Sequence, residues 1–392
     1  MGRGAPAGSR SLTLLRHPAR LRLHARIHDR HAVTSTPSVW VTVLAGGAGT
    51  RFWPLSTPRQ PKQLLPLAGP NPLIADTLAR VRGFVPPEKV RILAGPELVP
   101  QLRDATGLPR AAFMVEARPR GTGPVLARAA WEIEQTDPGA VLVSLHSDHL
   151  VRPAQNFRDV LRAAVEIARR DRLLLTVAVP PDRPETGYGY IKPGSPLGAP
   201  ERHRAYRVDG FVEKPDEETA TRYVAEGYRW NSGIFVWPAA TFLDEVVALA
   251  PEIARALPHL ERGDDTAFYE DAETISVDEA VLERSRRVAS IDATFHWDDI
   301  GGWEALARTR PADAEGNVCQ GRSYLADAED NIAVATSGQV VLLGVDGLLV
   351  VQTDRTTLVM PRAELPRLKQ YLTTIPSDFI FPPDRGADPD PG

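Results

Sequence analysis

The chain contains one cysteine among its 392 residues, Cys319, so an internal disulfide framework is excluded. Such sparse use of cysteine suits a reducing compartment, and we expect a cytoplasmic protein. An excess of positive charge is also missing, because 46 Lys and Arg residues face 50 Asp and Glu residues and the net charge is −4. A sequence-independent interaction with nucleic acid is therefore not expected.

Long hydrophobic runs are missing too. No apolar run reaches the roughly 18 residues that would indicate a membrane span, so we expect no membrane partner. The longest candidate, VVLLGVDGLLVV from Val340, is interrupted by Gly and Asp and predicts two buried strands. The composition that remains, 43% hydrophobic and 24% charged, is typical of a globular protein. This length allows one large domain with a smaller one, or two comparable domains.

The two ends of the chain differ from the rest. Residues 1–38 are rich in Arg and His and hold a single acid, Asp29. We interpret them as a basic, disordered extension, for which a flexible arm, an organellar transit peptide and a start codon placed too far upstream are alternative origins. Residues 376–392 are rich in Pro and Asp, and we expect a disordered tail there.

Between these ends, short apolar runs alternate with helix-like segments. The apolar runs predict strands at residues 41–45, 90–95, 140–145 and 173–179, and the segments between them predict helices at 72–83, 121–135 and 154–170. This alternation predicts an α/β domain over residues 39–312 with a Rossmann-like, mixed but mostly parallel sheet. In such sheets, ligands bind in the loops that follow the carboxyl ends of strands.

After residue 312 the pattern changes. Short β-like runs are separated by closely spaced turn residues, and little helical periodicity remains. We expect a small all-β domain over residues 313–375 that ends with a helix at 362–372.

A glycine-rich stretch, LAGGAGTRFWPLSTPRQPKQ from Leu44, directly follows the first predicted strand. Glycines let backbone N–H groups approach an anion, and Arg51 and Lys62 would add charge-assisted contacts to phosphate oxygens. The stretch is not a Walker A loop, because the terminal Gly-Lys-Ser/Thr is missing, and no third glycine completes a dinucleotide fingerprint. A turn that needs glycine only for packing is the alternative, and the two cations favour phosphate binding.

A second element, SLHSDHLV from Ser144, places Asp148 at the carboxyl end of a predicted strand, on the same edge as the glycine-rich stretch. A carboxylate beside phosphates predicts a Mg²⁺ ligand, with a turn or helix-capping role as the alternative. We interpret the flanking His146 and His149 as a turn residue and a buried core residue rather than as metal ligands.

A third element, FHWDDIGGWEAL from Phe295, contains the adjacent carboxylates Asp298 and Asp299. Neighbouring side chains in a strand point to opposite faces, so only one of the two can face the predicted crevice. A capping or turn aspartate before the next helix is the alternative.

Three further pieces are TGYGYI at residues 186–191, FVEKP at 211–215 and WNSGIFVW from Trp230. Each alone is explained by a turn, a solvated ion pair or a capped strand. Together with LAGGAGTRFWPLSTPRQPKQ, SDH and WDDIGGW, in this order, they resemble the nucleotide-sugar pyrophosphorylase family, most closely its mannose-1-phosphate guanylyltransferase branch. The resemblance covers about residues 41–372 and implies the nucleotide-diphospho-sugar transferase fold.

The resemblance also implies roles for the matching residues. Arg51 would stabilise the phosphates and the leaving pyrophosphate, Lys62 would contact the phosphates near the transferred group, and Asp148 and Asp299 would hold Mg²⁺. The implied nucleotide contacts are Leu44, Ala45, Gly46, Gly47, Gly49, Arg120 and Thr122. The implied sugar-phosphate contacts are Gly187, Glu213, Lys214 and Asn231.

The implied reaction joins GTP and mannose 1-phosphate to give GDP-mannose and pyrophosphate. A sugar-phosphate oxygen is already ionised near neutral pH, so the reaction needs in-line positioning and charge neutralisation rather than a general base. Four positions depart from the family pattern: His146 replaces a turn-forming proline, and in EARPRGTGPVLA Ala117 replaces a proline, Gly121 an asparagine and Gly123 an alanine. In relatives the latter segment lies beside the nucleotide, so base selectivity is the property we expect to be most affected.

Alternative functions remain open at this point. One is nucleotidyl transfer to another sugar 1-phosphate, such as a heptose or a different hexose phosphate, or from a nucleoside triphosphate with another base. The other is a regulatory paralogue that binds a nucleotide sugar without catalysis. The small β domain is also a candidate contact surface for a homo-oligomer.

Overall fold

The computed structural model describes residues 38–47, 49–58, 60–200 and 203–380. The predicted basic extension, 1–38, lies outside these residues except for Ser38, and so does the predicted tail beyond residue 380. Within that tail, residues expected to be disordered form a helical turn, α13 (Ser377–Ile380), whose last carbonyl accepts a hydrogen bond from the Trp53 indole at 3.4 Å. Throughout the described ranges, every helix is too short or too polar to cross a bilayer.

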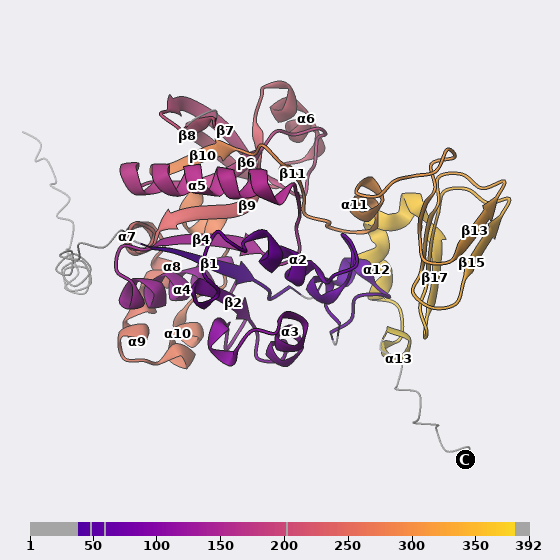
Figure 1. The fold of residues 1–392 in the computed structure, drawn as a ribbon, viewed down its shortest axis with the longest axis horizontal. Coiled ribbons are helices and arrows are strands. Elements are labelled where there is room, and N and C mark those ends of the chain that lie inside the picture. The colour runs from indigo at the N-terminus through magenta and orange to yellow at the C-terminus, as the bar shows by residue number, and fades with distance from the viewer. Residues whose placement is uncertain (1–37, 48, 59, 201–202, 381–392) are drawn as a thin grey trace, which may run out of the picture.

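A nine-stranded sheet forms the centre of the molecule (Figure 1). In sheet order its strands are β3 (Phe113–Val115), β2 (Val90–Ala94), β1 (Val39–Leu44), β4 (Val141–His146), β9 (Arg229–Pro238), β6 (Leu174–Val179), β10 (Val288–Asp292), β8 (Ala205–Glu213) and β7 (Gly189–Leu197). β1 pairs in parallel with β2 and β4, so that Val41 lies between Val90 and Val143. β9 runs antiparallel to both β4 and β6. The predicted mixed, mostly parallel α/β sheet is confirmed.

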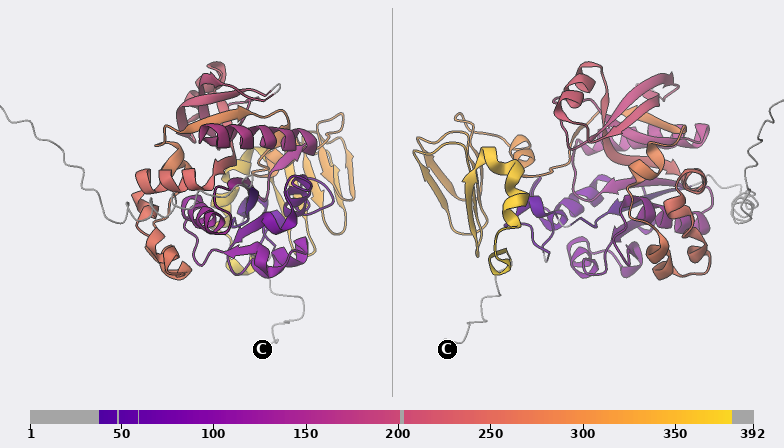
Figure 2. Two further views of the ribbon diagram at one scale, coloured as in Figure 1. Left: turned by 60° about the vertical axis from the view of Figure 1, so that its left-hand side comes forward. Right: turned by 180° about the vertical axis from the view of Figure 1, so that it is seen from behind.

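Helices cover both faces of this sheet (Figures 1 and 2). Alternate residues of β1 point to opposite faces: Val41 and Val43 pack with α2, α3 and α5, whereas Trp40 packs with α4 and α7 to α10. The helices of this region are α2 (Leu73–Arg80), α3 (Val99–Thr106), α4 (Thr122–Thr136), α5 (Ala154–Asp171), α6 (Glu217–Ala225), α7 (Ala239–Leu249), α8 (Pro251–Ala254), α9 (Leu257–Glu261), α10 (Asp265–Asp271) and α11 (Trp303–Arg308). Both faces of the sheet are therefore buried, as parallel strands require.

The C-terminal region is rich in strands and lies beside the sheet domain (Figure 1). One sheet contains β12 (Val318–Gln320), β14 (Ile332–Ala335), β16 (Leu348–Gln352) and β17 (Thr357–Pro361), and a second contains β13 (Ser323–Ala326) and β15 (Val340–Leu343). β12, β14 and β16 are parallel, so successive passes of the chain stack on one another. α12 (Leu368–Leu372) follows. A short two-stranded antiparallel sheet of β5 (Leu150–Arg152) and β11 (His296–Asp298) lies next to the candidate site.

A shared hydrophobic cluster joins the two regions. Phe52 and Leu65, from the loop after β1, pack in one cluster with Leu349 of β16. The Arg362 guanidinium donates two hydrogen bonds of 2.8 Å to the Glu304 carboxylate of α11. The C-terminal strands therefore support the loop that carries Arg51 and Lys62.

A cavity of about 880 Å³ lies between this loop and the C-terminal strands. Trp53, Gln60 and Arg355 are among the side chains that line it. Among the described residues that line it, none is a predicted site residue, so the cavity is separate from the candidate site.

Candidate active site

The glycine-rich loop leaves the carboxyl end of β1 and turns back against Lys62. Gly49 has a φ of +61°, and a Cβ there would lie 2.3 Å from the Lys62 Cβ, so only glycine fits. The Ser56 hydroxyl donates to the Gly49 carbonyl at 2.6 Å, and the Gln63 amide donates to the Ala45 carbonyl at 2.9 Å. These contacts hold the loop backbone between β1 and the turn that begins at Lys62.

The loop also meets the strand that delivers Asp148. The backbone N–H of Ser147 donates to the Leu44 carbonyl at 3.0 Å, which aligns the ends of β4 and β1. Gly46 and Gly47 are exposed beyond this point. Backbone groups of the loop and the Asp148 carboxylate therefore share one edge of the sheet, as expected for strands that run in the same direction.

Lys62 brings three of the four predicted catalytic residues together. Its ammonium group donates to the Asp148 carboxylate at 2.8 Å and to the Asp299 backbone carbonyl at 2.7 Å. The Lys62 residue is only 7% exposed. Burial alone would raise the pKa of Asp148, but the positive charge of Lys62 and its hydrogen bond lower it to about 2. Asp148 is therefore ionised at neutral pH.

The two adjacent aspartates of WDDIGG have different surroundings. Asp299 Oδ1 accepts hydrogen bonds from the Tyr188 hydroxyl at 2.6 Å and from the Gly301 N–H at 3.0 Å. Asp298 is 4% exposed and accepts from Arg308 of α11 at 3.2 Å and from the N–H two residues ahead at 2.7 Å. Asp299 thus contacts the cluster around Lys62, and Asp298 caps the following turn.

Arg51 and Tyr188 complete this cluster. Arg51 is exposed, and its guanidinium donates to the Gly301 carbonyl at 3.4 Å, over the turn that follows Asp299. The Tyr188 ring packs edge-on against Trp297 with centroids 5.1 Å apart. Burial and the charge of Asp299 raise the pKa of the Tyr188 hydroxyl far above its ordinary value, so it remains a hydrogen-bond donor.

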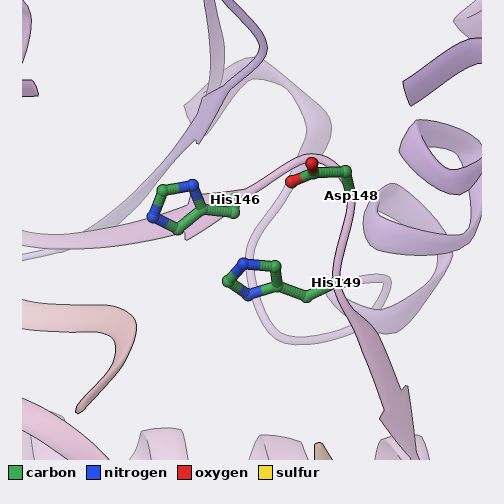
Figure 3. Close-up of side chains that lie close together, drawn as sticks. All are labelled: His146, Asp148 and His149. Atoms are coloured by element: carbon green, nitrogen blue, oxygen red, sulfur yellow. The ribbon is translucent and has the colours of Figure 1, made fainter. Parts of the chain in front are cut away.

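Two histidines lie against Asp148. The rings of His146 and His149 stack with centroids 4.6 Å apart, and ligand atoms of the two rings and of Asp148 lie within 4.8 Å of one another (Figure 3). Burial and the neighbouring His146 lower the pKa of His149 well below its ordinary value, so this ring is neutral. The Trp297 indole donates to His149 Nδ1 at 3.1 Å, which leaves the ring proton on Nε2. Nδ1 of His149 already accepts a hydrogen bond and Nε2 is protonated, so neither nitrogen of this ring is free to bind a metal.

The predicted sugar-phosphate residues lie on β8 and β9 or directly beside β7 and β8. Glu213 ends β8 and forms an ion pair with Lys214, whose φ is +47°. A Cβ on Gly189 would lie 2.6 Å from Glu213 Oε2 and 3.4 Å from the Asn231 Cβ. The structure therefore brings Glu213, Lys214 and Asn231 together, and Gly187 is exposed in the turn just before β7.

The two remaining predicted nucleotide contacts are engaged elsewhere. Arg120 Nε donates to the Tyr269 carbonyl of α10 at 2.7 Å. The Thr122 hydroxyl accepts from the Val277 N–H at 2.9 Å at the start of α4. Both side chains hold the segment before α4 in place, and neither contacts Lys62.

Another residue of this segment lies against the glycine-rich loop. Glu116 Oε2 lies 3.6 Å from the position of a Cβ on Gly46. Its other oxygen accepts from the Arg120 backbone N–H at 3.0 Å, and burial raises the pKa of the carboxyl.

The comparison with known families decides the class of protein, because a family model described as nucleotidyl transferase matches residues 41–316. This chain belongs to the nucleotidyl transferase family. It is 34% identical over 357 residues to the mannose-1-phosphate guanylyltransferase of Escherichia coli K12, covering 87% of this chain and 74% of that protein. Mannose-1-phosphate guanylyltransferase ManC of Salmonella typhimurium LT2 matches with the same identity and coverage.

A solved structure agrees with these relatives. The crystal structure of mannose-1-phosphate geranyltransferase from Thermus thermophilus is 31% identical, with a TM-score of 0.79, and the match covers 86% of this chain and 99% of that chain. The resemblance that the motifs predicted and the enzyme class, nucleotidyltransferase, are confirmed.

Sequence reasoning missed three side chains of this nucleotidyl transferase: Glu116, Tyr188 and Asp278. Glu116 and Tyr188 lie inside segments that the motifs single out, but their direction depends on tertiary packing. Asp278, which accepts a hydrogen bond from Asn231 at 2.9 Å, belongs to no motif, and only the fold brings the two together.

Proposed function

We propose that this nucleotidyl transferase transfers the guanylyl group of GTP to mannose 1-phosphate, giving GDP-mannose and pyrophosphate. The observation that carries this proposal is the Lys62 ammonium group, which joins the Asp148 carboxylate to the Asp299 carbonyl at the base of the glycine-rich loop. A buried cation and two carboxylates thus lie where a phosphate chain held by loop N–H groups would arrive. The relatives named mannose-1-phosphate guanylyltransferase support these substrates.

The oxygen donors at this cluster fit Mg²⁺. In the described ranges, the second carboxylate oxygens of Asp148 and Asp299 accept no hydrogen bond, although Oδ2 of Asp148 and Oδ1 of Asp299 do. Ionised carboxylates are the ligands that Mg²⁺ prefers, and we propose that these two would hold the ion. When bound, Mg²⁺ would supply charge neutralisation for the phosphates.

The cationic side chains of the chain account for the rest of the chemistry. A phosphate oxygen of the sugar phosphate attacks the α-phosphorus of the nucleotide, and the bond to pyrophosphate breaks on the opposite side. Lys62 lies beside the reacting phosphates, Arg51 is exposed near the loop to accompany the leaving pyrophosphate, and Lys214 contacts the sugar phosphate. Because the attacking oxygen is already ionised, no side chain has to remove a proton, and in-line positioning supplies the main effect.

We assign base selectivity to Glu116. A carboxylate can accept two parallel hydrogen bonds from the N1–H and the exocyclic amino group of guanine, and adenine and uracil lack this pair of adjacent donors. Glu116 lies against Gly46 of the loop and is fixed by the Arg120 N–H. The Glu116→Gln variant should therefore lose its preference for GTP over ATP while it keeps its fold.

The test is a pyrophosphate-release assay with Mg²⁺ that crosses GTP, ATP, UTP and dTTP with mannose, glucose and heptose 1-phosphates. We expect turnover with GTP and mannose 1-phosphate, and a loss of at least about 100-fold in Asp148→Asn and Asp299→Asn. Asp104→Asn, on the exposed surface of α3, is the control and should match the unmodified protein. Turnover confined to another pair of substrates would refute GTP and mannose 1-phosphate as the substrates. No turnover with any pair would refute the proposal that this protein transfers a nucleotidyl group to a sugar phosphate.

A further inference from the structure

Asp278 is a partly buried carboxyl group on the sugar-phosphate side of the site. It begins a π-helical turn, Asp278–Leu282, and lies 47 residues after Asn231 in the chain. Its Oδ1 accepts a hydrogen bond from the Asn231 amide at 2.9 Å. Burial, and then the negative charge of Glu213, raise its pKa to about 7, with Lys214 acting in the opposite direction. Asp278 therefore contacts Asn231 directly, and the charges of Glu213 and Lys214 act on its carboxyl group.

The contacts of Asn231 show what Asp278 does there. The Asn231 carbonyl oxygen accepts from the Thr176 hydroxyl at 2.7 Å and from the Gly233 N–H at 3.3 Å, while its amide nitrogen donates to Asp278. A flipped amide would place two acceptors, the Asn231 oxygen and the Asp278 carboxyl, against each other. Asp278 and Thr176 therefore fix the orientation of the amide from opposite ends, and Asn231 can present only an N–H to a substrate.

The surroundings of Gly189 show where a sugar would meet these groups. Glu213 Oε2 and the Asn231 Cβ would lie only 2.6 Å and 3.4 Å from a Cβ on Gly189, so the glycine allows these two side chains to converge between β7, β8 and β9. Two carboxyl groups, Glu213 and Asp278, then flank one amide donor. Carboxyl oxygens accept hydrogen bonds from hydroxyls, and each oxygen has two lone pairs, so Asp278 retains capacity after it has bonded Asn231. This arrangement matches neighbouring hydroxyls on one sugar ring.

We propose that Asp278 determines sugar specificity: it orients the Asn231 amide and accepts a hydroxyl of the sugar ring. The enzyme then selects a hexose 1-phosphate with free neighbouring hydroxyls and discriminates against deoxy analogues. A site built to hydrogen-bond a hydroxyl rejects the analogue that lacks it, because its buried polar group is left unpaired. This inference rests on the proposed function, which places the sugar phosphate beside Glu213 and Lys214.

The test compares mannose 1-phosphate with its four monodeoxy analogues in the unmodified enzyme and in Asp278→Ala. We expect the substitution to raise the KM for mannose 1-phosphate by about 10-fold or more, with the KM for GTP unchanged. For one deoxy analogue, the one without the contacted hydroxyl, the substitution should lower kcat/KM the least, because only the orientation of the Asn231 amide remains to be lost. An equal penalty for every analogue would show a purely structural role and overturn the proposal.

Two further variants separate contact from positioning. Thr176→Val removes the other anchor of Asn231, so it should raise the KM without changing which analogue is tolerated. Glu279→Gln is the control. Glu279 is the exposed neighbour of Asp278 and accepts a hydrogen bond from the Ser276 hydroxyl at 2.9 Å, so the variant should change neither the KM for mannose 1-phosphate nor the KM for GTP.

A binding measurement guards against loss of the fold. Asp278→Asn keeps the size of the side chain, and calorimetry with GDP-mannose should show a weaker Kd while GTP binding is unchanged. Equal binding of GDP-mannose by Asp278→Asn and Asp278→Ala at the unmodified Kd would overturn the proposal. A failure of the proposed function is distinguishable, because the unmodified enzyme would then turn over another sugar 1-phosphate or none.

Discussion

Replacing Glu134 by Gln should stabilise the protein at alkaline pH without affecting catalysis. Glu134 is 4% exposed, lies in the last turn of α4, and accepts from the Gly139 N–H with both oxygens. Burial, with repulsion from Asp137 and Asp244, raises its pKa from 4.5 to about 7. The carbonyl end of a helix is also unfavourable for negative charge.

The magnitude follows from linkage. Between pH 4.5 and about 7 the folded protein keeps a proton that the unfolded chain releases, so stability falls as the pH rises through this window and is constant above it. A pKa difference of this size corresponds to about 3 kcal/mol, and Gln avoids this cost because it is never charged. The Gln amide leaves one donor without a partner, which costs about 1 kcal/mol. We expect a net gain of about 2 kcal/mol at pH 8.

The assay is urea unfolding followed by tryptophan fluorescence at pH 4.5 to 8, with steady-state activity measured in parallel. The advantage of Glu134→Gln should be small at pH 4.5, grow up to pH 7 and then stay level. Glu132→Gln, on the same helix, is the control: it breaks an ion pair with Arg128 and should bring no gain at pH 8. An advantage that does not depend on pH, or a less stable variant at pH 8, would refute the reasoning.

Three further predictions concern the site. Gly49→Ala should displace Lys62, whose Cβ lies 2.3 Å from the new methyl position, and lower kcat/KM on the order of 100-fold in steady-state assays. Gly121→Asn, which restores the asparagine of related motifs, should lower the free energy of unfolding by about 1–3 kcal/mol, because φ is +79° and a Cβ would lie 2.6 Å from the Ile275 carbonyl; thermal denaturation measures this. Tyr188→Phe removes the hydroxyl that donates to Asp299, a candidate Mg²⁺ ligand, and should raise the Mg²⁺ concentration for half-maximal activity by about 10-fold. The KM for GTP should stay unchanged, which would show that the variant keeps its structure.

Local pattern was sufficient for the elements that bury a continuous apolar face. The strand expected at residues 41–45 is β1 (Val39–Leu44), and the helix expected at 154–170 is α5 (Ala154–Asp171). The position of β9 could not be read in this way. It enters between β4 and β6 as an antiparallel strand, and that pairing depends on partners 51 or more residues away in the chain.

The residues of the candidate site also differ in how far the sequence predicts their positions. Lys62 and Asp148 come from motifs that follow β1 and β4 on one edge of the nine-stranded sheet, so their meeting could be anticipated. Asp299 follows β11 of the separate two-stranded sheet, so its place beside them depends on the fold. The direction of a side chain within its motif could not be anticipated. Arg120 bonds α10 instead of the loop, whereas Glu116, four residues earlier, lies against the loop. The direction of each side chain is determined by packing against distant elements, so it cannot be predicted from the local sequence.

The shared hydrophobic cluster limits how far this enzyme can be treated as modular. The family match ends at residue 316, yet Phe52 and Leu65 behind the glycine-rich loop pack against residues beyond it, such as Leu349. A chimaera that joined residues 41–316 to the C-terminal strands of another protein would have to match these side chains across the junction. Recombination between relatives should therefore succeed when the loop and the strands are inherited together, and fail when they come from different parents.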